Sequence, residues 1–283
     1  MPGSRIPVDD PDDPALAVFF RNERGLASRA QRRDDAGTGL FLAEGDLVVE
    51  RALDAGCEPV SVLADGADPP PVVDRLTDAH GIDVFMGGER LRRAITGLGV
   101  IQPVVAVFRR PARPAARELV DGAARLVVVE GVDNPTNVGS IVRNAAAFGW
   151  DGLLLDHTSA DPLARRSLRV AMGTVFSLPH ARTGDLVSAL TAAAASGVIV
   201  LALTPDGGGD GRRGGGNGDE IIDVGTLDLA DHVRRAVLIG AEREGLSRGL
   251  LQLATHRVRI PMADGVDSLN AAAATAVACY ALR

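Results

Sequence analysis

The chain has 283 residues, 46% of them hydrophobic, and a formal net charge of −7, so it can bury the cores of two domains and is not a uniformly basic nucleic-acid binder. All 30 basic residues are arginine, which excludes a Walker-type phosphate loop, a Schiff base and a Ser-Lys nucleophile, because each needs lysine. Cys57 and Cys279 have neither zinc nor disulfide spacing and are predicted to be packing residues.

The N-terminal segment does not resemble an export or membrane signal. No uninterrupted apolar stretch reaches the roughly 18 residues that cross a bilayer, and residues 1–14 are rich in Asp and Pro. We therefore expect a cytoplasmic protein without a membrane partner, with a disordered tail over residues 1–14. The stretch "FFRNERGLASRAQRR" that follows is interpreted as a solvated amphipathic helix, with phosphate contact as the alternative.

Two successive α/β units are predicted. Short apolar runs alternate with helical stretches of about ten residues up to Phe108, which indicates a compact α/β unit over residues 15–109. The Pro- and Arg-rich segment 110–122 is predicted to be a linker. A second series follows over residues 123–283, with expected strands "LVVVE", "GLLLD", "VIVLAL", "AVLIG" and "HRVRIP". Helical stretches separate most of these strands, so we expect a parallel sheet that is covered on both faces and binds ligands at its carboxyl edge.

A glycine-rich stretch, "GGGDGRRGGGNGDE", contains the dinucleotide spacing GxGxxG at Gly209, Gly211 and Gly214. That fingerprint requires a helix after the third glycine, with its N-terminus facing the pyrophosphate. More glycine and a β-like run follow instead. We interpret the stretch as a flexible surface loop rather than as the nicotinamide site of an oxidoreductase.

The stretch "GVDNPTNVGSIVRNAAAFG", residues 131–149, follows a predicted strand and begins a helix that ends near Gly149. The side chains of Asn134 and Asn137 are able to bond backbone amides or a ligand. Arg143 lies less than two turns beyond Asn137, so we expect both side chains at one cleft. The residues alone leave open a second interpretation, in which Arg143 pairs with a neighbouring carboxylate.

Two later segments repeat this sequence of strand, polar residues and helix. In "AVLIGAEREGLSRGLL" the strand delivers Gly240 and Glu242 to its carboxyl end, and "EGLS" begins a helix. In "HRVRIPMADGVDSLNAAAATAVACYALR", Ser268 is expected to cap an apolar final helix. Asn270 then lies in the first turn as a polar group that needs a partner.

Together the three segments resemble the SpoU-TrmH family of RNA ribose 2'-O-methyltransferases, within the SPOUT superfamily. "NPTNVGSIVRNAAAFG", "LIGAEREGLS" and "IPMADGVDSLNAAAATA" are similar to the three motifs of that family, in the same order. The preceding α/β unit resembles the L30e-like RNA substrate-binding domain that many members carry. The resemblance implies an α/β methyltransferase domain with a parallel sheet, a deep trefoil knot and homodimer formation.

The resemblance also implies a cofactor, S-adenosylmethionine, held in a pocket formed largely by backbone groups of the second and third motifs. Transfer of its methyl group to a ribose 2'-hydroxyl needs no metal. The implied cofactor-binding residues are Leu203, Thr204, Ile239, Gly240, Glu242, Ile260, Met262, Ser268, Leu269 and Asn270.

The implied catalytic residues are Asn137, Arg143, Glu242, Ser268 and Asn270. Family proposals make the arginine a base, but its pKa above about 12 means that a neutral guanidine near pH 7 costs on the order of 7 kcal/mol. The role of Arg143 stays open between base and positioning of ribose or phosphate. Glu242 and Asn270 would shape the RNA pocket and hold the reacting groups in line.

RNA affinity is expected from Arg165, Arg166 and Arg169, which lie on a predicted helix near the catalytic face. The L30e-like unit favours 23S ribosomal RNA as the substrate, with transfer RNA as the alternative. A non-catalytic RNA-binding module on the same fold is a further alternative. The polar residues of the implied catalytic set argue against it, since a scaffold needs none of them.

Overall fold

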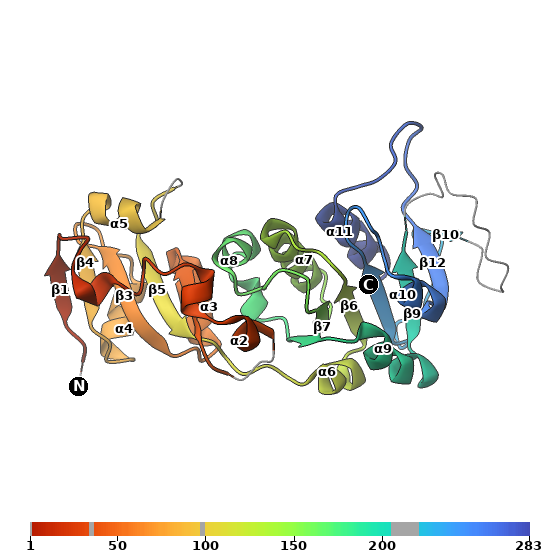
Figure 1. The fold of residues 1–283 in the computed structure, drawn as a ribbon, viewed down its shortest axis with the longest axis horizontal. Coiled ribbons are helices and arrows are strands. Elements are labelled where there is room, and N and C mark those ends of the chain that lie inside the picture. The colour runs from red at the N-terminus through yellow and green to blue at the C-terminus, as the bar shows by residue number, and fades with distance from the viewer. Residues whose placement is uncertain (1, 34–36, 97–99, 205–220) are drawn as a thin grey trace. The chain divides into compact units, whose positions relative to one another are not determined.

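The computed structural model of the protein describes residues 2–33, 37–96, 100–204 and 221–283 (Figure 1). The chain divides into an N-terminal unit, Met1–Ala112 with Leu163–Phe176, and a C-terminal unit, Arg113–Pro162 with Ser177–Arg283. The N-terminal unit thus includes a segment that the sequence analysis placed in the methyltransferase domain. The glycine motif at Gly209, Gly211 and Gly214 lies outside the described residues.

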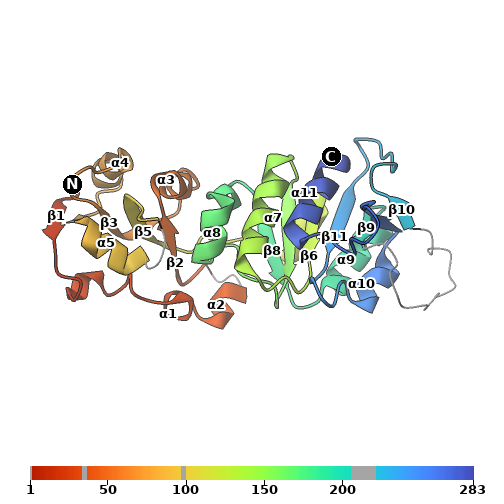
Figure 2. The ribbon, with the colours of Figure 1, turned by 90° about the horizontal axis from the view of Figure 1, so that it is seen from above.

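In its described part, the N-terminal unit has a five-stranded sheet of order β1-β4-β3-β5-β2. The strands are β1 (Arg5–Val8), β2 (Leu40–Glu44), β3 (Pro59–Asp65), β4 (Val84–Gly87) and β5 (Val104–Arg109). The helices are η1 (Pro14–Leu16), α1 (Glu23–Leu26), α2 (Arg29–Arg33), α3 (Asp46–Asp54), α4 (Val72–Asp78), α5 (Glu89–Thr96), α8 (Arg165–Ala171) and η2 (Thr174–Phe176). Helices α3 and α4 cover one face of the sheet and α5 lies on the other (Figure 2).

The first strand corrects the expectation that residues 1–14 are disordered. β1 pairs in parallel with β4, and the Ser4 amide donates to the Asp83 carboxylate at 2.7 Å. β1 is an edge strand, where Pro7 is tolerated although it has no N–H to donate. The Asp- and Pro-rich composition concealed this strand because its stabilising partner lies nearly 80 residues away in the chain.

The arginine-rich stretch after residue 18 also differs from the single amphipathic helix that was predicted, because it forms two short helices. Asn22 caps α1 by accepting hydrogen bonds from the amides of Arg24 and Gly25, and α1 ends at Leu26 before α2 begins. Phe19 and Leu26 are buried in an apolar cluster with strand residues such as Leu63. This burial divides the stretch into two short helices held against the sheet.

In its described part, the C-terminal unit has a seven-stranded sheet of order β10-β12-β9-β11-β6-β7-β8. The strands are β6 (Arg125–Val129), β7 (Gly152–Asp156), β8 (His180–Thr183), β9 (Ile199–Leu203), β10 (Ile221–Asp223), β11 (Arg235–Ile239) and β12 (His256–Arg259). The helices are α6 (Ala116–Gly122), α7 (Pro135–Ala147), α9 (Leu186–Ala195), α10 (Arg248–Leu253) and α11 (Ala271–Ala281).

Every strand pair of this sheet is parallel among the described residues, as the sequence predicted. Helices α7 and α11 pack side by side over one face, and α9 and α10 lie on the other (Figure 2). Strands β8 and β10 were missed, because "HART" and "IID" have no extended apolar run. The knot and the L30e-like character of the first unit stay predictions.

The central strands are buried on both faces, which explains their continuous apolar runs. The side chains of β6 and β11 are almost entirely inaccessible. Cys279 lies on the buried side of α11, and burial raises the pKa of its thiol to about 12; burial likewise raises the pKa of the Cys57 thiol to about 11. Both thiols therefore stay protonated at neutral pH, as packing residues do.

In the ranges that the structure describes, no helix has both the length and the apolar character needed to span a bilayer.

Candidate active site

The polar residues predicted to matter follow β6, β9 and β11, three adjacent strands at the centre of the parallel sheet. β6 leads into α7, which carries Asn137, and β11 leads to Glu242. Because the carboxyl ends of parallel strands meet at one edge, these loops converge there. The loop between β12 and α11 closes the same region.

A cavity of about 340 Å³ lies at this edge. Nine of the ten residues predicted to bind the cofactor line it, and Asn270 is the exception. The cavity wall also includes residues that sequence reasoning missed, namely Ala241, Arg243, Glu244, Gly245, Leu246, Leu251, Ala271 and Ala274. All of them except Leu251 lie inside the second and third motifs, so including every residue of these two motifs would have found them.

Gly240 is required by a close approach of backbone to backbone. A β-carbon at this position would lie 2.4 Å from the carbonyl carbon of Gly245, a separation that no side chain tolerates. The chain turns back on itself here, with an isolated bridge between Ala241 and Gly245, whose φ of 67° suits glycine. The fold at the cavity wall therefore depends on a bare backbone directly after β11.

Three of the predicted catalytic side chains form a closed polar cluster, which we call the amide–carboxylate cluster: Asn137, Glu242 and Asn270. The Asn137 side-chain amide donates to Glu242 Oε1 at 2.7 Å. Asn270 Nδ2 donates to Glu242 Oε1 and to Asn137 Oδ1, both at 3.0 Å. Three segments far apart in the chain are thereby held together by side-chain hydrogen bonds.

The orientation of this cluster follows from the helix cap of α11. Asn270, not Ser268 as predicted, is the N-cap residue, since its Oδ1 accepts from the amides of Ala272 and Ala273. With the oxygen committed to the cap, Nδ2 must face Glu242 and Asn137. Ser268 is exposed and lines the cavity before the helix begins.

The two predicted residues of α7 lie on different faces of that helix. Six residues of α-helix turn through about 1.7 turns, so the side chains of Asn137 and Arg143 point about 120° apart. Asn137 is 6% exposed, whereas Arg143 is exposed and has no hydrogen bond or ion pair with a described residue. The alternative in which Arg143 pairs with a neighbouring carboxylate is therefore not observed in the described part of the chain.

Asn144, one place further along α7, lies on the same face as Asn137. Its side-chain amide donates to the Ala272 carbonyl at 2.8 Å and so joins α7 to the first turn of α11. The signal in the sequence was the seven-residue spacing from Asn137, which brings two asparagines to one helix face. This contact therefore holds α7, which carries Asn137, against the first turn of α11, which Asn270 caps.

The loop between β6 and α7 is held by Asp156 at the end of β7. Its carboxylate accepts hydrogen bonds from the amides of Gly131 at 3.1 Å and Ser159 at 2.9 Å. Burial by itself raises the pKa of Asp156, but bonds from Ser159, Thr158 and Gly131 outweigh it and hold that pKa below its ordinary value. The carboxylate therefore stays ionised and fixes the loop that precedes Asn137.

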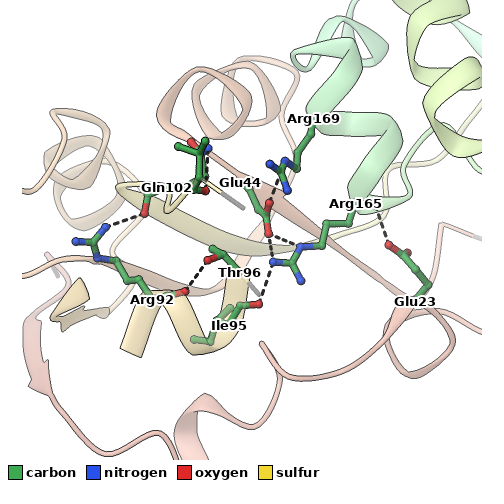
Figure 3. A network of polar contacts seen from close by, with 9 residues as sticks. Glu23, Glu44, Arg92, Ile95, Thr96, Gln102, Arg165 and Arg169 are labelled. Atoms are coloured by element: carbon green, nitrogen blue, oxygen red, sulfur yellow. Dashed lines mark hydrogen bonds and ion pairs between the residues drawn. The ribbon is translucent and has the colours of Figure 1, made fainter. Parts of the chain in front are cut away.

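The three arginines predicted to bind RNA are not equivalent. Arg165 and Arg169 of α8 both pair with the buried carboxylate of Glu44 in the N-terminal unit (Figure 3). Arg166 is exposed and makes no such contact among the described residues.

The fold and the site together define the class of protein: it is an α/β protein with a cavity at the carboxyl edge of a parallel sheet and a polar cluster beside that cavity. Residues 124–280 match the SpoU rRNA methylase family. An "uncharacterized tRNA/rRNA methyltransferase" of Mycobacterium bovis is 36% identical over 96% of this chain and 90% of its own length. A 23S rRNA (guanosine(2553)-2'-O)-methyltransferase of Bacillus subtilis is 27% identical over 89% of this chain and 92% of its own.

Among solved structures, an AdoMet-bound rRNA methyltransferase from Sinorhizobium meliloti superimposes with a TM-score of 0.75 at 28% identity, covering 99% of this chain and 97% of that one. The chain therefore belongs to the SpoU rRNA methylase family. This confirms the resemblance read from the three motifs and the expectation of a methyltransferase enzyme with an α/β fold.

Proposed function

We propose that this protein transfers a methyl group from S-adenosylmethionine to a ribose 2'-hydroxyl of 23S ribosomal RNA. The observation that carries the proposal is the amide–carboxylate cluster, which brings three predicted catalytic residues together beside the cavity. The B. subtilis relative, aligned over most of both chains, supports ribosomal RNA and the 2'-hydroxyl. The M. bovis relative, described as a tRNA/rRNA enzyme, keeps transfer RNA as the second candidate.

The residues around the cavity fit S-adenosylmethionine. The volume of about 340 Å³ is within the range of small-molecule sites. Leu203, Ile239, Met262 and Leu269 provide apolar walls, and the backbone beside Gly240 provides polar groups that no side chain covers. Thr204 lines the cavity with a buried hydroxyl that has no hydrogen-bond partner among the described residues. When bound, the cofactor supplies an electrophilic sulfonium methyl group.

The amide–carboxylate cluster and Arg143 have different proposed roles in binding the RNA. The Glu242 carboxylate, aligned by two amide donors on Oε1, has its other oxygen left to accept a hydrogen bond from the ribose hydroxyl. Arg143 stays charged, because a neutral guanidine is too costly, and its exposed side chain binds phosphate or ribose. We therefore assign Arg143 to positioning the RNA rather than to accepting the proton.

The test is transfer of labelled methyl from S-adenosylmethionine to total RNA of a strain that lacks the gene, with 2'-O-methyl-sensitive sequencing of the product. We expect label at one ribose of 23S RNA with the wild type. Arg143→Ala and Glu242→Gln should each lower kcat/KM by about a hundredfold or more. Arg117→Ala is the matched control, since its exposed pair with Asp121 contributes little.

Absence of label in every RNA, with no cofactor binding by calorimetry, would overturn the proposal and leave a non-catalytic module. Label in transfer RNA alone would replace the proposed substrate by the second candidate.

We further propose that the protein works in the cytoplasm as a homodimer formed through its C-terminal unit. Helix α11 is apolar along most of its length, and two of its large apolar side chains, Val277 and Tyr280, are 40% and 55% exposed. A dimer formed through this helix would cover both side chains. Sedimentation of the wild type as a dimer, and of Tyr280→Glu as a monomer, is the expected result; a monomeric wild type would refute the dimer.

A further inference from the structure

Helix α8 is held in the N-terminal unit by a carboxylate that is almost completely buried. The Glu44 side chain is 1% exposed and pairs through Oε1 with the Arg165 guanidinium and through Oε2 with Arg169 Nε at 3.5 Å. Figure 3 shows Glu44 pointing between the two arginines. Arg165 also donates to the Ile95 carbonyl at 2.9 Å. The Arg165 guanidinium is thus committed to contacts within the protein, and Arg169, whose side chain is 38% exposed, adds a longer ion pair to the same carboxylate.

The N-terminus of α8 receives a cap from another helix. Ala164, its N-cap residue, has no side chain that caps, and the Arg165 amide donates instead to the Glu23 carboxylate of α1 at 2.8 Å. Glu44 therefore pairs with the side chains of Arg165 and Arg169, and Glu23 caps the backbone at the start of the helix. The position of α8 is accounted for without Arg166.

Arg166 is the residue of α8 that the fold does not explain. It lies in the first helical turn, where a cation opposes the helix dipole at a cost of a few tenths of a kcal/mol, and that turn has no acidic residue. Its side chain is exposed, with no hydrogen bond or ion pair among the described residues. A cation that is unfavourable for the helix dipole and makes no stabilising contact in the described fold is typical of a functional position.

We propose that Arg166 of α8 binds a backbone phosphate of the RNA. Arg165 and Arg169 are instead structural cations, since their ion pairs with Glu44 hold the helix in place. This inference rests on the proposed function, because it takes RNA as the substrate. It assigns the contact to one of the three arginines that the sequence had grouped together. Glu44 is accordingly a positioning residue for Arg166.

The experiment measures methyl transfer to deproteinised 23S RNA from the gene-deletion strain at several RNA and KCl concentrations. We expect Arg166→Ala to raise KM for RNA several-fold with little change in kcat, because the residue binds but does not react. The slope of log KM against log salt should fall by about one, as for loss of one phosphate contact. Arg166→Lys should restore most of the affinity, since it keeps the charge.

Two matched variants remove a positive charge elsewhere in the chain. Arg169→Gln removes one from the same helix, and Arg117→Ala removes an exposed one from α6. Both should leave the salt slope at the wild-type value, with thermal melts confirming that each variant is folded.

An unchanged KM and slope in Arg166→Ala would overturn the inference, as would an equal loss of slope in Arg169→Gln. A wild-type enzyme that methylates no RNA would instead refute the proposed function, so the two failures are distinguishable. If Arg169→Gln does not fold, the comparison of Arg166→Ala with Arg166→Lys and Arg117→Ala still decides.

Discussion

The side-chain amide of Asn270 has two structural roles, one for its oxygen and one for its nitrogen. Its oxygen caps α11 and its nitrogen donates to Glu242 and Asn137. Aspartate is as good an N-cap as asparagine but has no donor. Asn270→Asp should therefore keep the helix cap while lowering kcat by about a hundredfold, because it removes the donor to Glu242 and places a second carboxylate oxygen beside it.

The control for that prediction is Asn270→Ala, which removes the cap as well and should lose about 1 kcal/mol of stability in addition to activity. An active Asn270→Asp enzyme would show that the donor to Glu242 is dispensable.

Gly240 gives a second prediction at the scale of single residues. In Gly240→Ala the added methyl would lie 2.4 Å from the Gly245 carbonyl carbon, so the two backbone segments must separate. We expect a loss of about 1–3 kcal/mol of stability and of cofactor binding, measured by urea unfolding and calorimetry. Gly122→Ala in α6 is the matched control, because a β-carbon there meets no atom within 4 Å and should be neutral or slightly stabilising.

Between elements, Asp156 ties the end of β7 to the loop that leads into α7. Since the pKa of Asp156 is lower in the folded protein, its contribution to stability is present above the unfolded value near 3.9 and is lost as the pH falls through the folded value. We expect Asp156→Asn to be less stable than the wild type at pH 7, with the difference shrinking below about pH 4. Urea midpoints across this range measure it.

Asp264→Asn, at an exposed position without a described hydrogen bond, is the control and should change the urea midpoint at pH 7 little. A constant difference between Asp156→Asn and the wild type down to the lowest pH would contradict the assignment.

At the scale of the whole molecule, the N-terminal unit is assembled from two separated stretches of chain. Replacing both cations, as in Arg165→Met with Arg169→Met, keeps α8 in the chain and leaves the Glu44 carboxylate buried without a partner cation. An uncompensated buried charge costs about 3–5 kcal/mol, whereas an apolar residue of similar size removes that cost. Glu44→Leu should therefore stabilise this double variant in thermal unfolding but destabilise, or leave unchanged, the wild-type chain. The same sign in both would show that the buried ion pairs do not hold α8 in this unit.

The sequence by itself determined the three motifs, their order and the parallel sheet of the C-terminal unit, because strand and helix periodicity and motif spacing are local properties. It also identified nine residues that the cavity brings together. What only the tertiary structure decided depends on partners far apart in the chain. β1 exists through β4, and Asn270 rather than Ser268 caps α11. Of the three arginines of α8, Arg165 and Arg169 are structural cations because a single buried carboxylate, 121 residues from Arg165, pairs with both, whereas Arg166 has no ion pair among the described residues.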